Sequence, residues 1–320
     1  MSLIFNGTDI KEVVYNGTVL DKVIYNGTVV FEKIVGLPDG TIGLFYGGNN
    51  VAGNDVDRLD SNIAYVGITS YVGTARAVSA GANVGGNGLF YGGATSNDVD
   101  LNKVTIINSD GVLVGSERNT GTYRRGHAGC TVGSNGLFYG GYKRPGGNVT
   151  TYNTIIRINN LGNQVGSETS GGYARSSFAG VTAGANGLFC GGNSYSRTVT
   201  LIDSNGAIKS ETQSATISTR TGLGGVSVGG KCFYYSGANS YTMTQKLAIF
   251  NNDGTMVGAE TSVGIKRDSA NGCNIGGNAV YYGGGGGPNI ITVLAPTGAL
   301  ARTEIWITSK YKSNHSSVGL

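Results

Sequence analysis

The chain has 320 residues, of which 57 are glycine and only four are proline. Charged residues make up 13% of it, about half the usual share, while 39% are hydrophobic and 9% aromatic. This composition excludes collagen, a proline-rich linker and a disordered chain, and it indicates a folded, turn-rich, all-β protein.

The charge pattern and the N-terminus exclude two kinds of partner. The formal net charge of +4 comes from 23 basic and 19 acidic residues, with no run of Lys or Arg, so nucleic acid is not expected to bind. The first ten residues lack the basic and apolar regions of a secretory signal, and no 18 apolar residues run together. Neither secretion nor membrane insertion is therefore expected.

A ten-residue unit occurs three times from residue 4, as IFNGTDIKEV, VYNGTVLDKV and IYNGTVVFEK. It places Phe5, Tyr15 and Tyr25 in register, each followed by Asn-Gly-Thr. Asn-Gly between β-forming residues is a strong hairpin signal, and without a secretory signal we prefer it to the glycosylation sequon that the triplet also matches. So short a β segment buries little core alone, so we predict that residues 1–34 form an attachment or oligomerisation arm.

A longer repeat fills residues 35–320 and is marked by an apolar strand that ends in a glycine doublet, as in GLFYGG. The doublets begin at residues 47, 92, 140, 191, 236 and 283, with Ser in place of the first Gly at 236. Six copies at a period near 47 residues predict a six-bladed β-propeller with four strands per blade. The C-terminal segment 311–320 reads as an inner strand without its GLFYGG partner, so it should complete the first blade and close the ring.

Most units also carry one acidic and one basic residue at fixed places. Features found in every blade are expected to hold blades together, whereas a reaction centre must break the symmetry. We therefore interpret the two series as a repeated ion pair and not as a ring of carboxylate binders. The acids are Glu117, Glu168, Glu211, Glu260 and Glu304, with Ile68 in the first blade, and the bases are Arg76, Arg124, Arg175, Arg220, Arg267 and Lys312.

No metal site or cofactor is predicted. The cysteines lie far apart without a CxxC pair, and Cys190 occupies a position that holds Tyr in sister repeats, so they are expected to be buried free thiols. His127 and His315 take equivalent places on blades that are not neighbours, which disfavours a shared metal. The single acid of each Asn- and Gly-rich turn is too little for calcium.

The chain resembles two known families. Residues 37–320, with an apolar strand ending in Gly-Gly and four strands per repeat, resemble the kelch propellers but lack their recurrent Trp. The resemblance implies a propeller that binds through the loops on one face. The repeated YNGT units of the arm resemble the beginnings of bacteriophage tail and other virion proteins.

The segments after the glycine doublets vary most between units, so they break the repeat. Tyr, Asn and Arg gather in them and offer flat apolar faces together with donors for hydroxyl and carboxylate groups. We predict ligand-binding loops there, with solvated surface loops as the plainer alternative. The candidate ligand-binding residues are Tyr142, Lys143, Arg144, Asn193, Tyr195, Arg197, Asn239 and Tyr241.

These observations predict a non-enzymatic virion component, made in the host cytoplasm and placed on a phage tail or other part of the particle. Its arm, through Phe5, Tyr15 and Tyr25, would contact other virion proteins and support a homo-oligomer, while the propeller binds a host surface glycan or protein or acts as a spacer. One alternative is a glycan hydrolase or lyase, which needs two facing carboxylates. Another is an intracellular kelch-type adaptor. The local acid cluster that could serve an enzyme is Asp55, Asp57, Asp60, Asp98 and Asp100.

Overall fold

The chain divides into two compact units, Met1–Pro38 and Asp39–Leu320. In the first unit β1 (Val13–Tyr15) pairs with β2 (Thr18–Leu20), and β3 (Lys22–Tyr25) pairs with β4 (Thr28–Glu32), all antiparallel. Each pair flanks one Asn-Gly dipeptide, which confirms the hairpin prediction for the second and third units. The first repeat, with Phe5, and the side chains of Tyr15 and Tyr25 lie outside the described residues. The computed structural model describes residues 13–15, 18–20, 22–25, 28–32, 42–48, 53–193, 197–214, 217–285, 290–302, 304–306 and 313–320.

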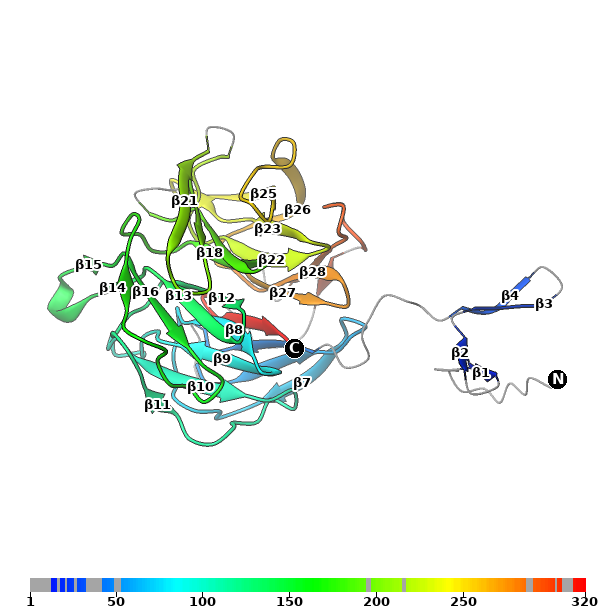
Figure 1. Cartoon of the computed structure of the whole chain (residues 1–320), viewed down its shortest axis with the longest axis horizontal. Coiled ribbons are helices and arrows are strands. Elements are labelled where there is room, and N and C mark those ends of the chain that lie inside the picture. The colour runs from blue at the N-terminus through cyan, green and yellow to red at the C-terminus, as the bar shows by residue number, and fades with distance from the viewer. Residues whose placement is uncertain are drawn as a thin grey trace. The chain divides into compact units, whose positions relative to one another are not determined.

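The second unit is a six-bladed β-propeller, as predicted, and its antiparallel sheets radiate from a common axis (Figure 1). In order from the axis outward, blade 1 holds β31 (Ser316–Gly319), β5 (Gly43–Tyr46), β6 (Val56–Leu59) and β7 (Tyr65–Thr69). Blade 2 holds β8 (Ala80–Val84), β9 (Asn87–Tyr91), β10 (Lys103–Ile107) and β11 (Arg118–Asn119). Blade 3 holds β12 (Ala128–Val132), β13 (Asn135–Tyr139), β16 (Thr154–Ile158) and β17 (Thr169–Ser170).

The other three blades repeat this order. Blade 4 holds β18 (Ala179–Ala183), β19 (Asn186–Cys190), β20 (Thr198–Ile202) and β21 (Ile208–Gln213). Blade 5 holds β22 (Gly224–Val228), β23 (Lys231–Tyr235), β25 (Thr242–Asn251) and β26 (Thr261–Arg267), and β24 (Ala238–Asn239) also pairs with β25. Blade 6 holds β27 (Asn271–Ile275), β28 (Asn278–Tyr282), β29 (Ile290–Leu294) and β30 (Ile305–Trp306).

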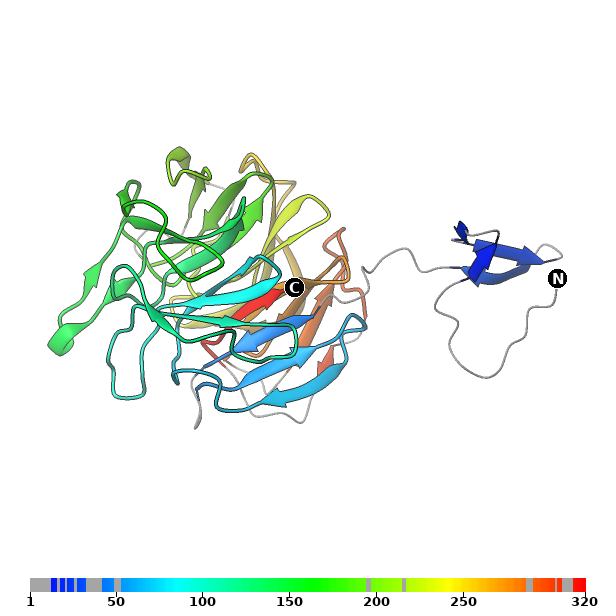
Figure 2. The ribbon, with the colours of Figure 1, turned by 60° about the horizontal axis from the view of Figure 1, so that its bottom comes forward.

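The C-terminal strand closes the ring, which confirms the predicted closure. β31 pairs with β5, from the other end of the propeller sequence, so the red and blue strands lie in one sheet (Figures 1 and 2). Ile42 and Leu320 exchange two backbone hydrogen bonds of 3.1 and 2.8 Å beside this pair. Ser79 and Ser316 also join their hydroxyls at 2.8 Å, which ties β31 to the start of β8 in blade 2.

The core is divided among the blade interfaces. The described residues form six hydrophobic clusters, and each joins one blade to the next around the ring. Phe138 of β13, for example, is fully buried, and its ring lies 5.2 Å from that of Tyr91 in blade 2. The second strand of each blade is apolar along its length because a neighbouring blade covers each face.

Glycine is required at two kinds of place. A Cβ at Gly129 in the inner strand β12 would lie 2.6 Å from the Phe138 ring, so glycine lets that ring pack against the strand. In the doublets the backbone is left-handed, with φ of 66° at Gly92, where a Cβ would lie 2.5 Å from the Arg124 carbonyl oxygen. The doublet therefore turns the chain out of the second strand directly under the neighbouring arginine.

Five buried arginines join consecutive blades, each from the segment that leads from one blade's outer strand to the next blade's inner strand. Their Nη1 atoms donate to the carbonyl oxygen of the first doublet residue in the following blade, at 2.6–3.2 Å. Four of their guanidinium groups also lie over a Tyr ring of the preceding blade, at 5.2–6.0 Å from its centroid. The five are Arg76, Arg124, Arg175, Arg220 and Arg267.

The predicted ion pairs form in two ways. Arg124 reaches Glu168, and Arg220 reaches Glu260, directly at 2.5 Å. Arg175 instead donates to Thr200, which donates to Glu211 at 2.6 Å, and Arg267, Thr292 and Glu304 repeat this relay. Arg76 combines the two, with Thr105 between it and Glu117 and a direct separation of 3.6 Å. The prediction of a repeated ion pair is therefore correct for three blades and needs a bridging hydroxyl in two.

Blade 1 supplies its carboxylate from another strand. Asp57 of β6 lies opposite Ile68 of β7, the position where the other blades carry Glu, and its side chain is buried. The hydroxyls of Tyr65 and of Tyr282 in blade 6 donate to the two oxygens of Asp57, at 3.0 and 3.2 Å. The acid missing from the repeat in blade 1 is thus replaced by one on the paired strand, and Lys312 lies outside the described residues.

Candidate functional site

A groove of about 870 Å³ opens between the loops that follow the glycine doublets of blades 2 and 3. One wall is the blade 2 loop around Asp98 and Asp100, and the other is a short hairpin of β14 (Tyr142–Lys143) and β15 (Thr150–Thr151) joined through a 3-10 turn, η1 (Pro145–Gly147). Its lining residues are Asn97, Asp98, Val99, Asp100, Thr122, Tyr123, Lys143, Arg144, Pro145, Gly146, Gly147 and Tyr152.

The sequence of the 3-10 turn explains the shape of the hairpin wall. Pro145 begins the 3-10 turn, where a fixed φ is favourable, and Gly146 and Gly147 follow with φ of 58° and 90°. The turn projects the hairpin away from the blade (Figure 1). The Lys143 and Arg144 side chains thus line the groove from this hairpin.

Arg125 holds the two walls together. Its Nε donates to Asp100 at 2.5 Å, its Nη1 donates to Asp98, and its Nη2 donates to the Asp98 carbonyl oxygen at 2.9 Å. The second oxygen of Asp100 accepts from the Arg144 backbone N–H at 2.7 Å. One buried guanidinium and two carboxylates therefore fix both loops at once.

The electrostatics of this network favour the charged forms of Asp98 and Arg125. Hydrogen bonding from Arg125 lowers the pKa of Asp98 below its ordinary value. Burial alone would lower the pKa of Arg125, but the hydrogen bonds that it donates to Asp100 and Asp98 outweigh this effect and raise that pKa. An acid with a lowered pKa is a poor proton donor near neutral pH, so Asp98 does not suit general-acid chemistry.

The predicted binding residues separate into two sets. Lys143 and Arg144 line the groove, while the Tyr142 ring packs under the Arg125 guanidinium at 5.7 Å and supports the wall. Asn193 on blade 4 donates to the Ser176 hydroxyl at 3.3 Å, Arg197 is exposed, and Tyr241 is fully exposed on the blade 5 hairpin that follows Asn239. These four do not line the groove, and Tyr195 lies outside the described residues.

Sequence reasoning missed Arg125, Tyr123 and Tyr152, although the repeat contained a signal. Arg125 directly follows Arg124, one of the repeated basic residues. Of the six residues that follow a repeated basic residue, Arg125 alone is basic. The others there are Ala77, Ser176, Thr221, Asp268 and Ser313. A residue that breaks the repeat next to a doublet loop is what a site on a symmetric scaffold requires.

The predicted acid cluster is dispersed. Asp55 and Asp57 are buried in blade 1, and Asp60 accepts the backbone N–H groups of Asn62 and Ala64 in a turn. Asp98 and Asp100 share the Arg125 guanidinium, while Asp55 and Asp57 both lie near Tyr65 in blade 1. The cluster therefore does not form a single arrangement of carboxylates.

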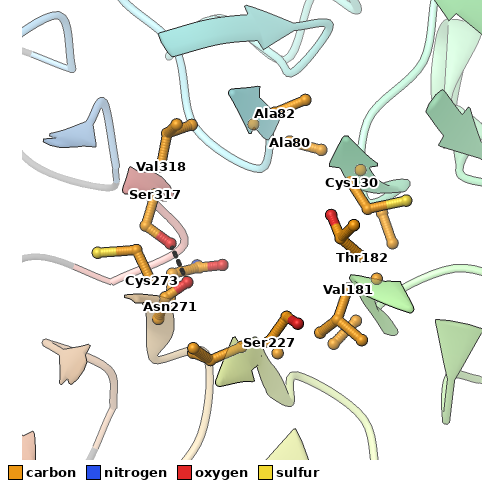
Figure 3. A pocket seen from close by; sticks show the side chains of 18 of the residues that line it. Ala80, Ala82, Cys130, Val181, Thr182, Ser227, Asn271, Cys273, Ser317 and Val318 are labelled. Carbon is orange, nitrogen blue, oxygen red and sulfur yellow. Dashed lines mark hydrogen bonds between the residues drawn. The ribbon is translucent and has the colours of Figure 1, made fainter. Parts of the chain in front are cut away.

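The propeller axis holds a cavity of about 250 Å³ lined by all six inner strands (Figure 3). Its polar side chains bond to neighbouring strands, with Thr131 donating to the Asn83 carbonyl and Thr182 to the Thr131 carbonyl, each at 2.8 Å. Ser317 likewise donates to the Gly272 carbonyl at 2.8 Å. These groups join the blades around the axis, so we assign them to the scaffold.

The histidines also belong to the scaffold. The buried His127 ring lies 5.1 Å from Tyr91 and 5.8 Å from Phe138, the position that Phe178 takes between Tyr139 and Phe189 one blade further on. Burial lowers the pKa of His127 well below its ordinary value. In the described part of the chain, no group of three or more His, Cys, Asp or Glu side chains is placed to hold a metal ion.

The four cysteines are buried free thiols, as expected. Cys190 ends β19 where other blades have Tyr, and burial raises its pKa to about 12. They therefore pack as small apolar residues.

Comparison with protein-family models and with curated proteins finds no match to this chain. Among the helices of the described residues, none has the length and apolar character to cross a membrane.

Proposed function

We propose that this protein is a non-enzymatic component of a bacteriophage tail or other virion structure, whose kelch-like propeller contacts a host surface ligand. The observation that supports this function best is the groove organised by Arg125, because it lies on the predicted loops and breaks the symmetry of an otherwise regular ring.

The N-terminal unit supports attachment to the particle. It is compact by itself and separate from the propeller, and its hairpins repeat the YNGT unit that resembles virion proteins. We propose that residues 1–34 contact other virion proteins through Phe5, Tyr15 and Tyr25 and bring several copies together. The propeller would then be the part presented to the host.

The acid pair at this groove, Asp98 and Asp100, gives the enzyme alternative no support. A retaining or inverting glycosidase needs one carboxyl group with a raised pKa. Asp98 has a lowered pKa, and Asp100 is bound by both Arg125 and the Arg144 N–H. We therefore propose binding without catalysis.

The test is immunogold microscopy of purified virions with an antibody against the propeller, together with two variants. Deleting residues 1–34 should abolish incorporation into particles. The double substitution Lys143→Ala and Arg144→Ala should leave incorporation intact and weaken adsorption to host cells. Absence of the protein from every particle, or incorporation without the arm, would contradict the proposal.

A further inference from the structure

The groove between blades 2 and 3 carries two cationic side chains, Lys143 and Arg144, and two acids, Asp98 and Asp100, with the Arg144 charge acting on Asp98. Asp98 and Asp100 are both engaged by Arg125. Within the residues that the structure describes, no hydrogen bond or ion pair uses the side chain of Lys143 or Arg144. The wall that carries Lys143 and Arg144 is therefore positively charged and can bind an anionic group.

Aromatic and aliphatic faces lie beside these cations. The Tyr123 side chain is 53% exposed at the groove, and Tyr152 lines it with the Arg124 guanidinium 5.4 Å from its ring centroid. Asn97 and Thr122 add an amide and a hydroxyl that can bond to sugar hydroxyls. Flat rings next to polar donors and free cations suit a sugar ring that bears an anionic group.

We propose that this groove binds an acidic saccharide, with its carboxylate or phosphate on Lys143 and Arg144 and a sugar ring against Tyr123 or Tyr152. This inference rests on the proposed function, since it names the host ligand of the same site. The same chemistry can come from a uronic acid or from a sugar or polyol phosphate.

The size and shape of the groove favour a saccharide over a protein. Its volume of about 870 Å³ falls in the range of small-ligand pockets, about 300–1,000 Å³. A protein partner would need a contact area of roughly 800 Å² on each side, with a packed apolar centre. A groove of this volume with charged side chains in its walls instead suits a short stretch of a chain-like ligand.

The groove is also preorganised. The Arg125 hydrogen bonds hold both walls, and Asp98 keeps a left-handed backbone with φ of 61° that Asp tolerates. Binding therefore does not need to order these loops, which spares part of the entropy cost of association. The Arg125 network acts as the positioning device, and Lys143 and Arg144 make the contact.

The experiment measures binding of the purified full-length protein to three probes by isothermal titration calorimetry. They are an oligogalacturonate, its methyl ester and an oligo(glycerol phosphate). We expect one or both anionic probes to bind, the methyl ester to bind at least about tenfold more weakly, and added salt to reduce the affinity. Whichever anionic probe binds identifies the source of the charge. Failure of both anionic probes at millimolar concentration, or equal binding of the ester, overturns the proposal.

Variants locate the binding. Arg144→Ala and Lys143→Ala should each weaken it by about tenfold, and Tyr123→Ala by a similar factor. Arg302→Ala and Lys209→Ala remove the same charges from exposed positions outside the groove and should change the affinity less than twofold. An equal loss in both sets would show non-specific charge attraction and refute the site.

A further experiment with virions and host cells distinguishes failure of this inference from failure of the proposed function. If the purified protein binds an acidic probe but the protein is absent from virions, the virion function is wrong and the groove assignment stands. If virions carry the protein and adsorption survives periodate oxidation of host glycans but not protease treatment, the ligand is a protein. In that case the saccharide inference is wrong and the virion function stands.

Discussion

The Nη2 atom of Arg124 lies 2.5 Å from the Glu168 carboxylate, whereas Arg175 reaches Glu211 only through the Thr200 hydroxyl. In blades 2 to 6 the difference follows the third-strand residue that pairs with the next-to-last residue of the second strand. Where this residue is Ile156 or Ala248 the contact is direct, and where it is Thr105, Thr200 or Thr292 the hydroxyl enters the network. The repeated interaction between Arg and Glu, which we call the staple, therefore exists in two versions, direct and bridged by a Thr hydroxyl. One residue of the third strand determines which version forms.

Removal of a directly paired glutamate should cost more than removal of a bridged one. Glu168→Ala leaves the fully buried Arg124 side chain bonded to Thr154 but without the carboxylate that it contacts directly, and should destabilise the protein by about 3 kcal/mol or more. Glu211→Ala leaves Arg175 bonded to Thr200 and should cost about 1–2 kcal/mol. Urea unfolding measures both, with the exposed Asp110→Asn as control. Equal losses for the two alanine variants would contradict the two-version staple.

His127 should make stability depend on pH. Burial lowers its folded-state pKa well below the ordinary 6.5, so the unfolded chain binds a proton that the folded chain does not. Stability is then fully present above pH 6.5 and falls by up to about 1.4 kcal/mol per pH unit below it. His127→Phe, which copies Phe178, should remove this dependence. The check is the difference in urea midpoint between variant and wild type at pH 8, 6 and 5, and a constant difference would disprove it.

The staple carboxylates should act at lower pH. Burial alone would raise the pKa of Glu168, but the Arg124 charge and the hydrogen bonds from Thr122 outweigh it and lower that pKa below its ordinary 4.5. A carboxylate with a depressed folded-state pKa stabilises the fold above pH 4.5 and loses that contribution as the pH falls through its folded value. Acid unfolding followed by circular dichroism should therefore begin below pH 4.5, later than the His127 effect. Glu168→Gln should flatten this acid limb, and an unchanged limb would contradict the assignment.

The thiols should be unreactive until the protein unfolds. All four cysteines are buried, and burial raises the pKa of Cys190 and of Cys232 to about 12, so little thiolate exists near neutral pH. Ellman's reagent should find almost no thiol in the native protein and four after denaturation. Tyr241→Cys, at a fully exposed position, is the positive control and should react at once. Rapid native reaction of a wild-type thiol would contradict the described burial.

Most of the fold can be predicted from the repeat in the sequence. Gly-Gly after an apolar strand predicts a left-handed turn out of that strand, and Gly92 takes it because no Cβ fits beneath the Arg124 carbonyl. The closure followed from counting strands at the two ends of the chain. Such features depend on residues close in sequence and on the period of the repeat, so the amino-acid sequence alone predicts them.

The groove depends on contacts between residues far apart in the sequence, which the sequence alone does not predict. Arg125 follows Arg124 in the sequence, and the repeated role of Arg124 says nothing about Arg125. The partners of Arg125, Asp98 and Asp100, belong to the preceding blade. Asp57 replaces the missing Glu of blade 1 only because the register sets it opposite Ile68. Both facts require knowledge of which strand lies beside which, and a period alone does not supply it.

Ring closure offers the last test. Gly319 in β31 lies against blade 6 so closely that a Cβ there would overlap the Asn274 carbonyl oxygen, and its own carbonyl accepts from Asn83 of blade 2 at 2.8 Å. Gly319→Ala should therefore push the closing strand away from both neighbours and cost about 1–3 kcal/mol. Gly171→Ala, whose Cβ would meet only the flexible end of Ile208 at 3.0 Å, is the matched control and should change stability little. The measurements are the melting temperature and limited proteolysis of the C-terminus. Wild-type stability and protection in Gly319→Ala would mean that the ring does not depend on the β31 seam.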